Sequence, residues 1–292
     1  MNPIEFPGLG LEFNIQRVAF SLFGKDVYWY GIIIATGMVL AVIYCYYNAR
    51  RFGIVPDRVL DMILFAAPLS IIGARIYYVI FYLDLYRRAD GSFDWGKAIA
   101  IWDGGLAIYG GVIVGILVLY VFCKVTHIKF LAFADLGVHG LLIGQAIGRW
   151  GNFCNQEAFG GLTNLPWRMG LTIGGQYMEV HPTFFYESLW NVIGLAFAHF
   201  YFKKHRKYDG QVFLFYLCWY GLGRMWIEGM RTDSLYLFNT GIRVSQLLAG
   251  ICFVVAGALL LYFHFKGKAD PSRLYVNQVK ENQTAEKTEE EA

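Results

Sequence analysis

The sequence has few charged residues for its length. Asp, Glu, Lys and Arg make up only 16% of its 292 residues, whereas hydrophobic residues make up 57%. A typical soluble domain has about 25% charged residues, so this composition argues against one. The net charge is only +3 and the cations are scattered along the chain. The sequence therefore indicates no nucleic-acid partner, because such partners require a concentrated basic patch.

Three other features are missing. The five cysteines form no Cys-x-x-Cys pair, and no two of the six histidines lie three or four residues apart, so we expect no metal site and no organic cofactor. Residues 1–22 lack a basic segment followed by an apolar run, so we expect no cleavable signal peptide. We find no internal repeat, which weakens the case for a transporter built from inverted repeats.

Long apolar runs dominate the remaining sequence. A helix needs about 20 predominantly apolar residues to cross the hydrocarbon core of a bilayer. The chain is therefore predicted to be an all-α polytopic membrane protein with about seven transmembrane helices. These cover residues 27–47, 59–83, 106–123, 130–147, 183–202, 212–230 and 244–265.

Basic residues follow every second predicted helix, such as Arg50 and Arg51 after the first and the basic run 203–207 after the fifth. Because cytoplasmic loops carry an excess of Lys and Arg, this pattern predicts an outside N-terminus and a cytoplasmic C-terminus. Residues 1–268 are predicted to form the membrane-embedded domain. Residues 269–292 are predicted to be a polar, disordered cytoplasmic tail. The long connection 149–182 should be a structured region that faces outward.

Residues 148–161, with the sequence GRWGNFCNQEAFGG, end a long apolar run with a group of polar side chains. These are Arg149, Asn152, Asn155 and Glu157. Unpaired polar groups in hydrocarbon cost several kcal/mol each, so a ligand or protein partners must satisfy them. The glycines allow positive φ angles or a close approach of the backbone to a ligand.

A second polar group lies on one face of the sixth predicted helix. Tyr220, Arg224, Glu228 and Arg231 follow one another at helical spacing. An Arg–Glu pair four residues apart neutralises itself, and the second arginine then leaves positive charge for an anion. Together with Arg149, these arginines would form a cationic pocket at the outer leaflet, suited to the phosphate of a lipid headgroup.

Several residues also have simpler interpretations. Arg75 lies deep in the second predicted helix and is either a site residue or one partner of a buried ion pair. His181 and Glu187 could simply cap and brace the fifth helix. A membrane transporter or channel for an anionic solute is the alternative function, supported by the intramembrane charges Arg75, Asp135 and His139.

The long motif in residues 148–160 resembles the signature of the prolipoprotein diacylglyceryl transferase family. The similarity extends to Tyr30-Gly31, to residues 103–111, to His181-Pro182 with Tyr186-Glu187, and to Arg224 with Glu228 and Arg231. The resemblance implies seven spans with an outside N-terminus, in a multi-pass protein of the bacterial cytoplasmic membrane. It also implies transfer of a diacylglyceryl group from phosphatidylglycerol to the lipobox cysteine in the signal peptide of a preprolipoprotein, with release of glycerol phosphate.

The resemblance assigns roles to individual positions. Arg149 would bind the headgroup, and Arg224 would stabilise the leaving phosphate. Many members have a histidine where this chain has Tyr109, and a tyrosine with a pKa near 10 is a poor base, so we expect Tyr109 to position the substrate or donate a hydrogen bond. The remaining substrate-binding residues would be Tyr30, Asn152, Asn155, Glu157, Gly160, His181, Tyr186, Glu187, Tyr220, Glu228 and Arg231.

Overall fold

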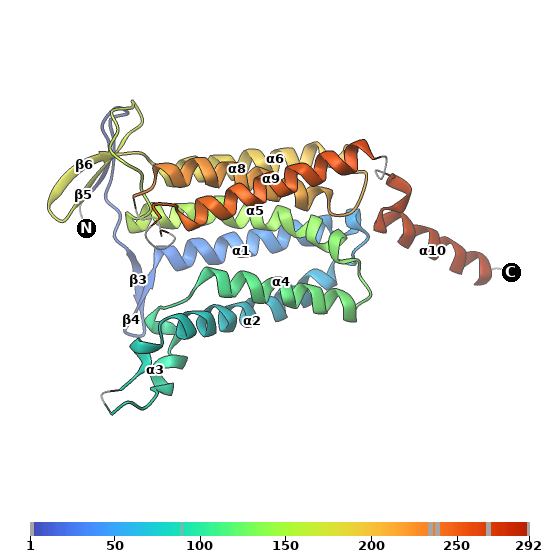
Figure 1. The fold of residues 1–292 in the computed structure, drawn as a ribbon, viewed down its shortest axis with the longest axis horizontal. Coiled ribbons are helices and arrows are strands. Elements are labelled where there is room, and N and C mark those ends of the chain that lie inside the picture. Colours follow the sequence, from blue (N-terminus) through green and yellow to red (C-terminus); the bar gives the residue numbers. More distant parts are fainter. Residues whose placement is uncertain (1–2, 89, 233–235, 237–239, 267–269, 291–292) are drawn as a thin grey trace.

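The protein is a bundle of long helices with small β-sheets at one end, as seen in a computed structural model (Figure 1). The structure describes residues 3–88, 90–232, 236, 240–266 and 270–290, with the backbone alone for 285–290. Its helices are α1 (Trp29–Asn48), α2 (Asp57–Phe81), α3 (Trp95–Ile99), α4 (Ile108–Val125), α5 (Phe130–Asn155), α6 (Thr183–Phe200), α7 (Phe202–His205), α8 (Gln211–Met230), α9 (Val244–Phe265) and α10 (Tyr275–Glu290).

In the part of the chain that the structure describes, six strands form two antiparallel sheets. They are β1 (Ile4–Phe6), β2 (Leu11–Phe13), β3 (Val18–Leu22), β4 (Lys25–Tyr28), β5 (Met169–Ile173) and β6 (Gln176–Val180). One sheet has the order β2-β1-β5-β6, and β3 and β4 form a separate hairpin that leads into α1. The expectation of an all-α protein is thus wrong for the segment before α1 and for the connection between α5 and α6. Apolar and polar residues alternate in Ile4-Glu5-Phe6 and Leu11-Glu12-Phe13, which is the pattern of strands.

All seven predicted membrane segments are helical, and five of these helices are long and apolar enough to cross a membrane: α1, α2, α4, α5 and α9. Helices α6 and α8 have the length but not the apolar composition. The reason lies in their buried polar residues, which include Glu187 and Asn191 on α6 and Glu228 on α8. The count of seven spans stays a prediction. The two chain ends lie at opposite ends of the bundle (Figure 1).

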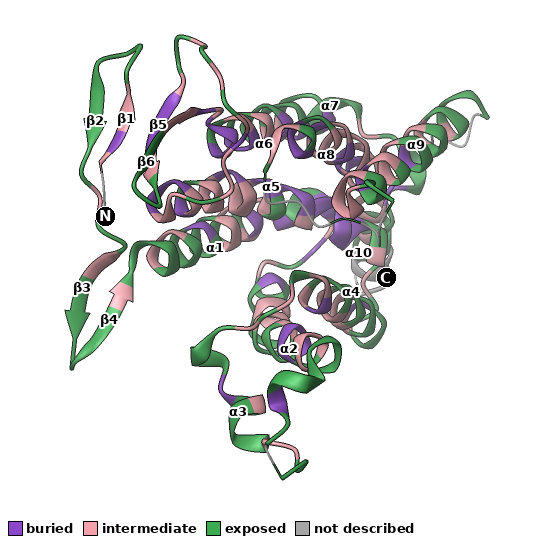
Figure 2. Ribbon diagram, turned by 60° about the vertical axis from the view of Figure 1, so that its left-hand side comes forward, coloured by how far each residue is buried: buried purple, intermediate pink, exposed green. Residues whose placement is uncertain are grey.

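Helix α5 is the centre of the bundle. It packs against α1, α6 and α8, while α9 covers α8 and α2 pairs with α4. Half of its apolar stretch is buried, compared with 11–28% for the other four apolar helices (Figure 2). Those helices leave large side chains such as Leu64 (72% exposed) and Ile108 (74% exposed) on their surfaces. Exposed aliphatic side chains of this kind are what a lipid-facing surface requires.

The GRWGNFCN motif is helical, contrary to the expectation that the outward connection begins at Arg149. Helix α5 continues through Asn155 and ends where Gln156 adopts a left-handed conformation with φ of 54°. The backbone N–H groups of Gln156 and Glu157 then bond back to the carbonyls of Phe153 and Asn152. Because the helix continues, Arg149 and Asn152 lie three residues apart on the same face of its last turns.

The connection between α5 and α6 is anchored by an apolar cluster. Its buried members come from β1, the end of α5, the β5–β6 hairpin and the start of α6: Ile4, Phe153, Cys154, Met169, Leu171, Val180 and Phe184. Burying each such side chain contributes about 1.5–3 kcal/mol. The four-stranded sheet is therefore fixed to the ends of α5 and α6 and holds the loop between them in place.

The tail forms structure where we expected disorder. A short 3₁₀ turn (Pro271–Arg273) precedes α10. Leu274 is buried, and the backbone N–H of Tyr275 donates to Asp209, which also pairs with Lys129 at 2.9 Å. The start of the tail thus docks on the end of the bundle opposite the sheets. The division of the chain into domains at residue 268 stays a prediction.

Within the described residues, Arg75 neither pairs with an aspartate nor joins a polar site. Its guanidinium donates five hydrogen bonds, at 2.5–3.1 Å, to backbone carbonyls of the segment between α2 and α4. The acceptors are Lys97, Ala98, Ala100, Gly104 and Gly105. One buried cation therefore provides hydrogen-bond donors for five backbone carbonyls of this irregular segment and fixes where α4 begins.

We predict that Arg75→Gln lowers the free energy of unfolding by at least about 3 kcal/mol, because five backbone carbonyls in part-buried or buried hydrogen bonds lose a charged donor. The measurement is the midpoint of thermal unfolding in detergent at a constant scan rate. Arg87→Gln is the matched control, since Arg87 lies on the same connection but is exposed. Equal midpoints for the two variants would contradict the assigned role.

Candidate active site

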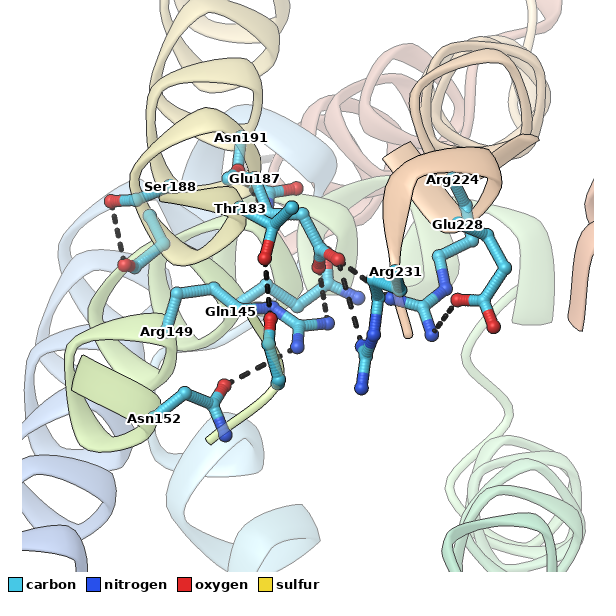
Figure 3. A network of polar contacts seen from close by, with 12 residues as sticks. Gln145, Arg149, Asn152, Thr183, Glu187, Ser188, Asn191, Arg224, Glu228 and Arg231 are labelled. Carbon is cyan, nitrogen blue, oxygen red and sulfur yellow. Dashed lines mark hydrogen bonds and ion pairs between the residues drawn. The ribbon is translucent and has the colours of Figure 1, made fainter. Parts of the chain in front are cut away.

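A buried carboxylate on α6 collects arginines from two other helices. Glu187 forms one ion pair with Arg149 of α5 and another, at 2.6 Å, with Arg224 of α8 (Figure 3). The Nη1 atom of Arg231, at the end of α8, lies 3.9 Å from Glu187 Oε1. The side chain of Glu187 is only 5% exposed. The convergence of the three arginines that the sequence predicted is therefore present, and Glu187 is its centre.

A second carboxylate holds Arg224 from its own helix. Arg224 Nη2 lies 2.5 Å from Glu228 Oε2, which is the ion pair expected from their four-residue spacing. Arg243, which precedes α9, donates to the backbone carbonyl of Glu228. Among the described residues, the guanidinium groups of Arg149, Arg224 and Arg231 thus meet the carboxylates of Glu187 and Glu228. A partly buried cationic site of this kind suits an anion with several oxygen acceptors.

The end of α5 contributes a chain of amides next to this cluster. Arg149 donates to Asn152 at 3.4 Å, and Asn152 donates to Glu157 at 2.9 Å. Asn155 also donates to Glu157, at 3.3 Å, and its backbone carbonyl accepts from Arg17. The polar residues of the motif are therefore linked to each other and to Arg149 by hydrogen bonds. This arrangement fixes the direction in which the Arg149 side chain points.

The loop after the motif is held between α6 and α8. The Gly160 N–H donates to the carbonyl of His181, and the Gly161 N–H donates to the carbonyl of Met230. A β-carbon on Gly160 would come within 2.7 Å of His181 Cβ, so only glycine fits there. His181 in turn contacts the Tyr186 hydroxyl at 3.3 Å. These residues shape the wall beside the arginines.

Tyr30 and Gly151 form a close contact between α1 and α5. A β-carbon on Gly151 would lie 2.7 Å from Cδ2 of the Tyr30 ring. The glycine therefore allows the aromatic ring to approach the motif helix directly. Tyr30 is itself 38% exposed, so the ring also borders the outside of the bundle.

Two predicted residues are not joined to the cluster. Tyr109 lies in the first turn of α4, within the α2–α4 pair, and in the described ranges no hydrogen bond or ion pair connects it to the arginines. Tyr220 lies one turn before Arg224 and stacks on Tyr216, with ring centroids 5.6 Å apart. The Tyr216 hydroxyl accepts a hydrogen bond from Gln145 at 2.8 Å. Tyr220 thus packs against a separate polar pair, Tyr216 and Gln145, next to the cluster.

Sequence reasoning missed several buried polar partners. Ser188 donates to the carbonyl of Ala146 at 2.8 Å and accepts from the Trp150 indole, which ties α6 to α5. Thr183 donates to the carbonyl of Ala158, and Asn191 is 2% exposed. The available signal was the spacing of Glu187, Ser188 and Asn191, which lie on one face of an otherwise apolar helix.

The comparisons with known proteins agree with this geometry. The family model of prolipoprotein diacylglyceryl transferase matches residues 17–263, most of the chain. The chain belongs to the prolipoprotein diacylglyceryl transferase family.

Individual relatives support this membership over nearly their full length. A phosphatidylglycerol–prolipoprotein diacylglyceryl transferase of Finegoldia magna is 45% identical over 246 residues, covering 84% of this chain and 94% of the relative. The protein of the same name from Clostridioides difficile is 43% identical, covering 87% and 97%. That from Streptococcus pneumoniae is 45% identical, covering 87% and 96%. The arginine cluster thus lies within the part of the transferase that its relatives share.

We predict that Gly151→Ala lowers the stability of the transferase by about 1–3 kcal/mol, because the added methyl group overlaps the Tyr30 ring. Gly144→Ala is the control. Gly144 lies on the same helix, and a β-carbon added there would have no neighbouring atom within 4 Å. Thermal unfolding of the two variants in the same detergent provides the comparison. A larger loss for Gly144→Ala would be inconsistent with the packing described here.

Proposed function

We propose that this chain transfers the diacylglyceryl group of phosphatidylglycerol to the lipobox cysteine in the signal peptide of a preprolipoprotein. Family membership and the names of its relatives support this activity. The observation that carries the proposed mechanism is the convergence of Arg149 and Arg224 on Glu187. The family assignment also favours a transferase over the alternative of an anion transporter or channel.

The reaction exchanges one bond for another at a glycerol carbon. The cysteine thiol loses its proton, the sulfur forms a C–S bond, and the C–O bond to the phosphate breaks. The electron pair leaves with glycerol phosphate, so a phosphodiester with one negative charge becomes a phosphomonoester that approaches two. Preorganised cations aimed at this developing charge lower the barrier. The nucleophile belongs to the substrate, so the chain needs no reactive cysteine of its own.

Each residue of the cluster has a distinct proposed role. Arg149 binds the phosphate of the headgroup, and Arg224 stabilises the charge that develops on the leaving group. Glu187 and Glu228 position the two guanidinium groups without touching the reacting atoms. Asn152, Asn155 and Glu157 form the polar floor beside Arg149, and the nearby guanidinium groups of Arg149 and Arg224 raise the thiolate fraction of the incoming cysteine.

The remaining residues border the site. Gly160, His181 and Tyr186 form the wall beside Arg231, Tyr30 lines the path of the lipid, and Tyr220 extends the polar face of α8. Among the described residues, no hydrogen bond or ion pair links Tyr109 to the cluster, so we assign it a hydrogen-bonding or positioning role toward the substrate. In this proposal the enzyme acts without a metal or organic cofactor.

We further propose how the chain lies in the membrane. Seven helices cross the bacterial cytoplasmic membrane, with α6 and α8 shielded by their neighbours. The N-terminal strands and the arginine cluster face outward, and α10 faces the cytoplasm. The basic residues Arg50, Arg51, Lys203 and Lys204 near the α10 end support this orientation.

Replacing either central arginine should abolish transfer. We expect Arg149→Ala and Arg224→Ala each to lower the rate at least about 100-fold, the scale seen when one preorganised donor to a developing charge is removed. The assay uses purified protein, phosphatidylglycerol vesicles and a lipobox peptide, with the Cys→Ser peptide as a blank. Unfolding scans confirm that the variants are folded.

Arg168→Ala is the matched control for charge, because Arg168 pairs with Glu179 near the hairpin, outside the cluster. We expect it to retain nearly full activity. Full activity in both Arg149→Ala and Arg224→Ala would rule out the assigned site, and no transfer by folded wild-type protein would rule out the function.

The tyrosine on α4 should matter much less than the arginines. We expect Tyr109→Phe to lose less than about tenfold in rate, because no hydrogen bond within the described residues joins the Tyr109 hydroxyl to the arginine cluster. The same peptide assay, run as a function of pH, measures this change. A loss as large as that of Arg149→Ala would instead make the Tyr109 hydroxyl part of the chemical step.

A further inference from the structure

A second polar site lies at the opposite end of the bundle. A cavity of about 500 Å³ opens between the ends of α1, α5 and α6 and is walled on one side by the start of α10. Helix α6 connects it to the active site, since Glu187 belongs to the first turns of this helix and Phe202, just beyond its end, lines the cavity. Fifteen residues of helix correspond to roughly 22 Å, so the two sites are separate.

The cavity is lined by cations and by no carboxylate among the described residues. Six basic side chains contribute to its wall: Arg50, Arg51, Lys203, Lys204, Arg206 and Lys280. None of the six forms an ion pair with a described Asp or Glu side chain. Cations from three chain segments line this one hollow; five of the six are exposed, and Arg206 is half-buried.

Arg206 is the most buried of these six cations, and Asp135 and Asp209 both lie close enough to attract it. Its Nη2 donates to the carbonyl of Arg51 at 3.2 Å, and its guanidinium lies 4.3 Å from the centroid of the Phe52 ring. Its Nη1 is buried and has no acceptor within the described residues. The carboxylate oxygens of Asp135, which attract Arg206 electrostatically, accept instead from the backbone N–H groups of Gly210 and Phe213. A buried donor without an acceptor costs about 1–3 kcal/mol.

The inner wall of the cavity is aromatic and apolar. The Tyr44 hydroxyl bonds to His199 Nδ1, and the Tyr44 ring stacks on His139 with centroids 5.4 Å apart. Phe202 and Val212 complete this surface. A cavity with cations at its rim and apolar groups inside fits a small anion attached to an organic group. Its volume matches the size of ordinary ligand pockets, about 300–1,000 Å³.

We propose that this cavity binds a phosphate group, held by Arg206 together with Arg51, Lys203 and Lys204. Phosphate oxygens provide several acceptors and up to two negative charges, which match an arginine fork and its neighbouring lysines. The phosphate comes either from an anionic phospholipid headgroup of the nearby leaflet or from a soluble phosphate ester. The site is independent of the diacylglyceryl transfer site and does not require that reaction.

The test measures binding to the purified full-length protein in a neutral detergent. Isothermal titration is run with inorganic phosphate and, separately, with dihexanoyl phosphatidic acid. We expect Arg206→Gln to weaken binding at least about tenfold, because a charge-assisted hydrogen bond is lost. Lys207→Gln is the matched control, since Lys207 is exposed and does not line the cavity. Arg149→Ala, at the other end of the bundle, should bind as the wild type does.

The two probes separate the sources of the phosphate. Binding of both probes identifies a soluble phosphate site, and binding of phosphatidic acid alone identifies a lipid headgroup site. If Arg206→Gln does not fold, the double variant Lys203→Gln/Lys204→Gln replaces it, with Lys124→Gln/Lys207→Gln as the charge-matched control. The proposal is overturned if neither probe binds, if cavity and control variants weaken binding equally, or if only Arg149→Ala loses it.

Discussion

The structure depends on keeping charge paired where water is scarce. Glu187 lies inside the bundle at 5% exposure, and breaking a buried ion pair leaves an uncompensated charge at a cost of about 3–5 kcal/mol. Arg149 and Arg224 can satisfy Glu187 only if α5, α6 and α8 converge at the same height. The same requirement therefore aligns three helices and assembles the site. It also explains why α6 and α8 are less apolar than the helices around them.

Much of this arrangement could be predicted from the sequence, because long apolar runs and charge spacing are local signals. The seven helical segments, the Arg224–Glu228 pair and the meeting of Arg149 with Arg224 and Arg231 all followed from such patterns. The function was predicted from the long motif in residues 148–160 and from the other matching segments, which follow one another in the order typical of the family. Orientation in the membrane and the role of each site residue stay predictions.

What could not be predicted depends on contacts between distant segments. Arg75 was expected to meet a carboxylate or a substrate, yet it binds carbonyls about 22 to 30 positions away along the chain. Glu187 had the appearance of a capping residue, because it lies near the start of its helix. The local sequence does not indicate which side chains from other helices will surround it. The extension of α5 through Asn155 depended on the docking of its last turn against the sheet. Periodicity reports which face of a helix is polar, but not what that face meets.

The pairing of β1 with β5 has a consequence for how the protein is made. Glu5 lies opposite Gly170, so Glu5 must wait until synthesis has reached Gly170 before it finds its partner. Pairing across such a separation is slow, because a long loop must close first. The cover over the α5–α6 connection can thus close only after several helices are in the bilayer. The end of the bundle that carries the arginine cluster is therefore completed among the last parts of the fold.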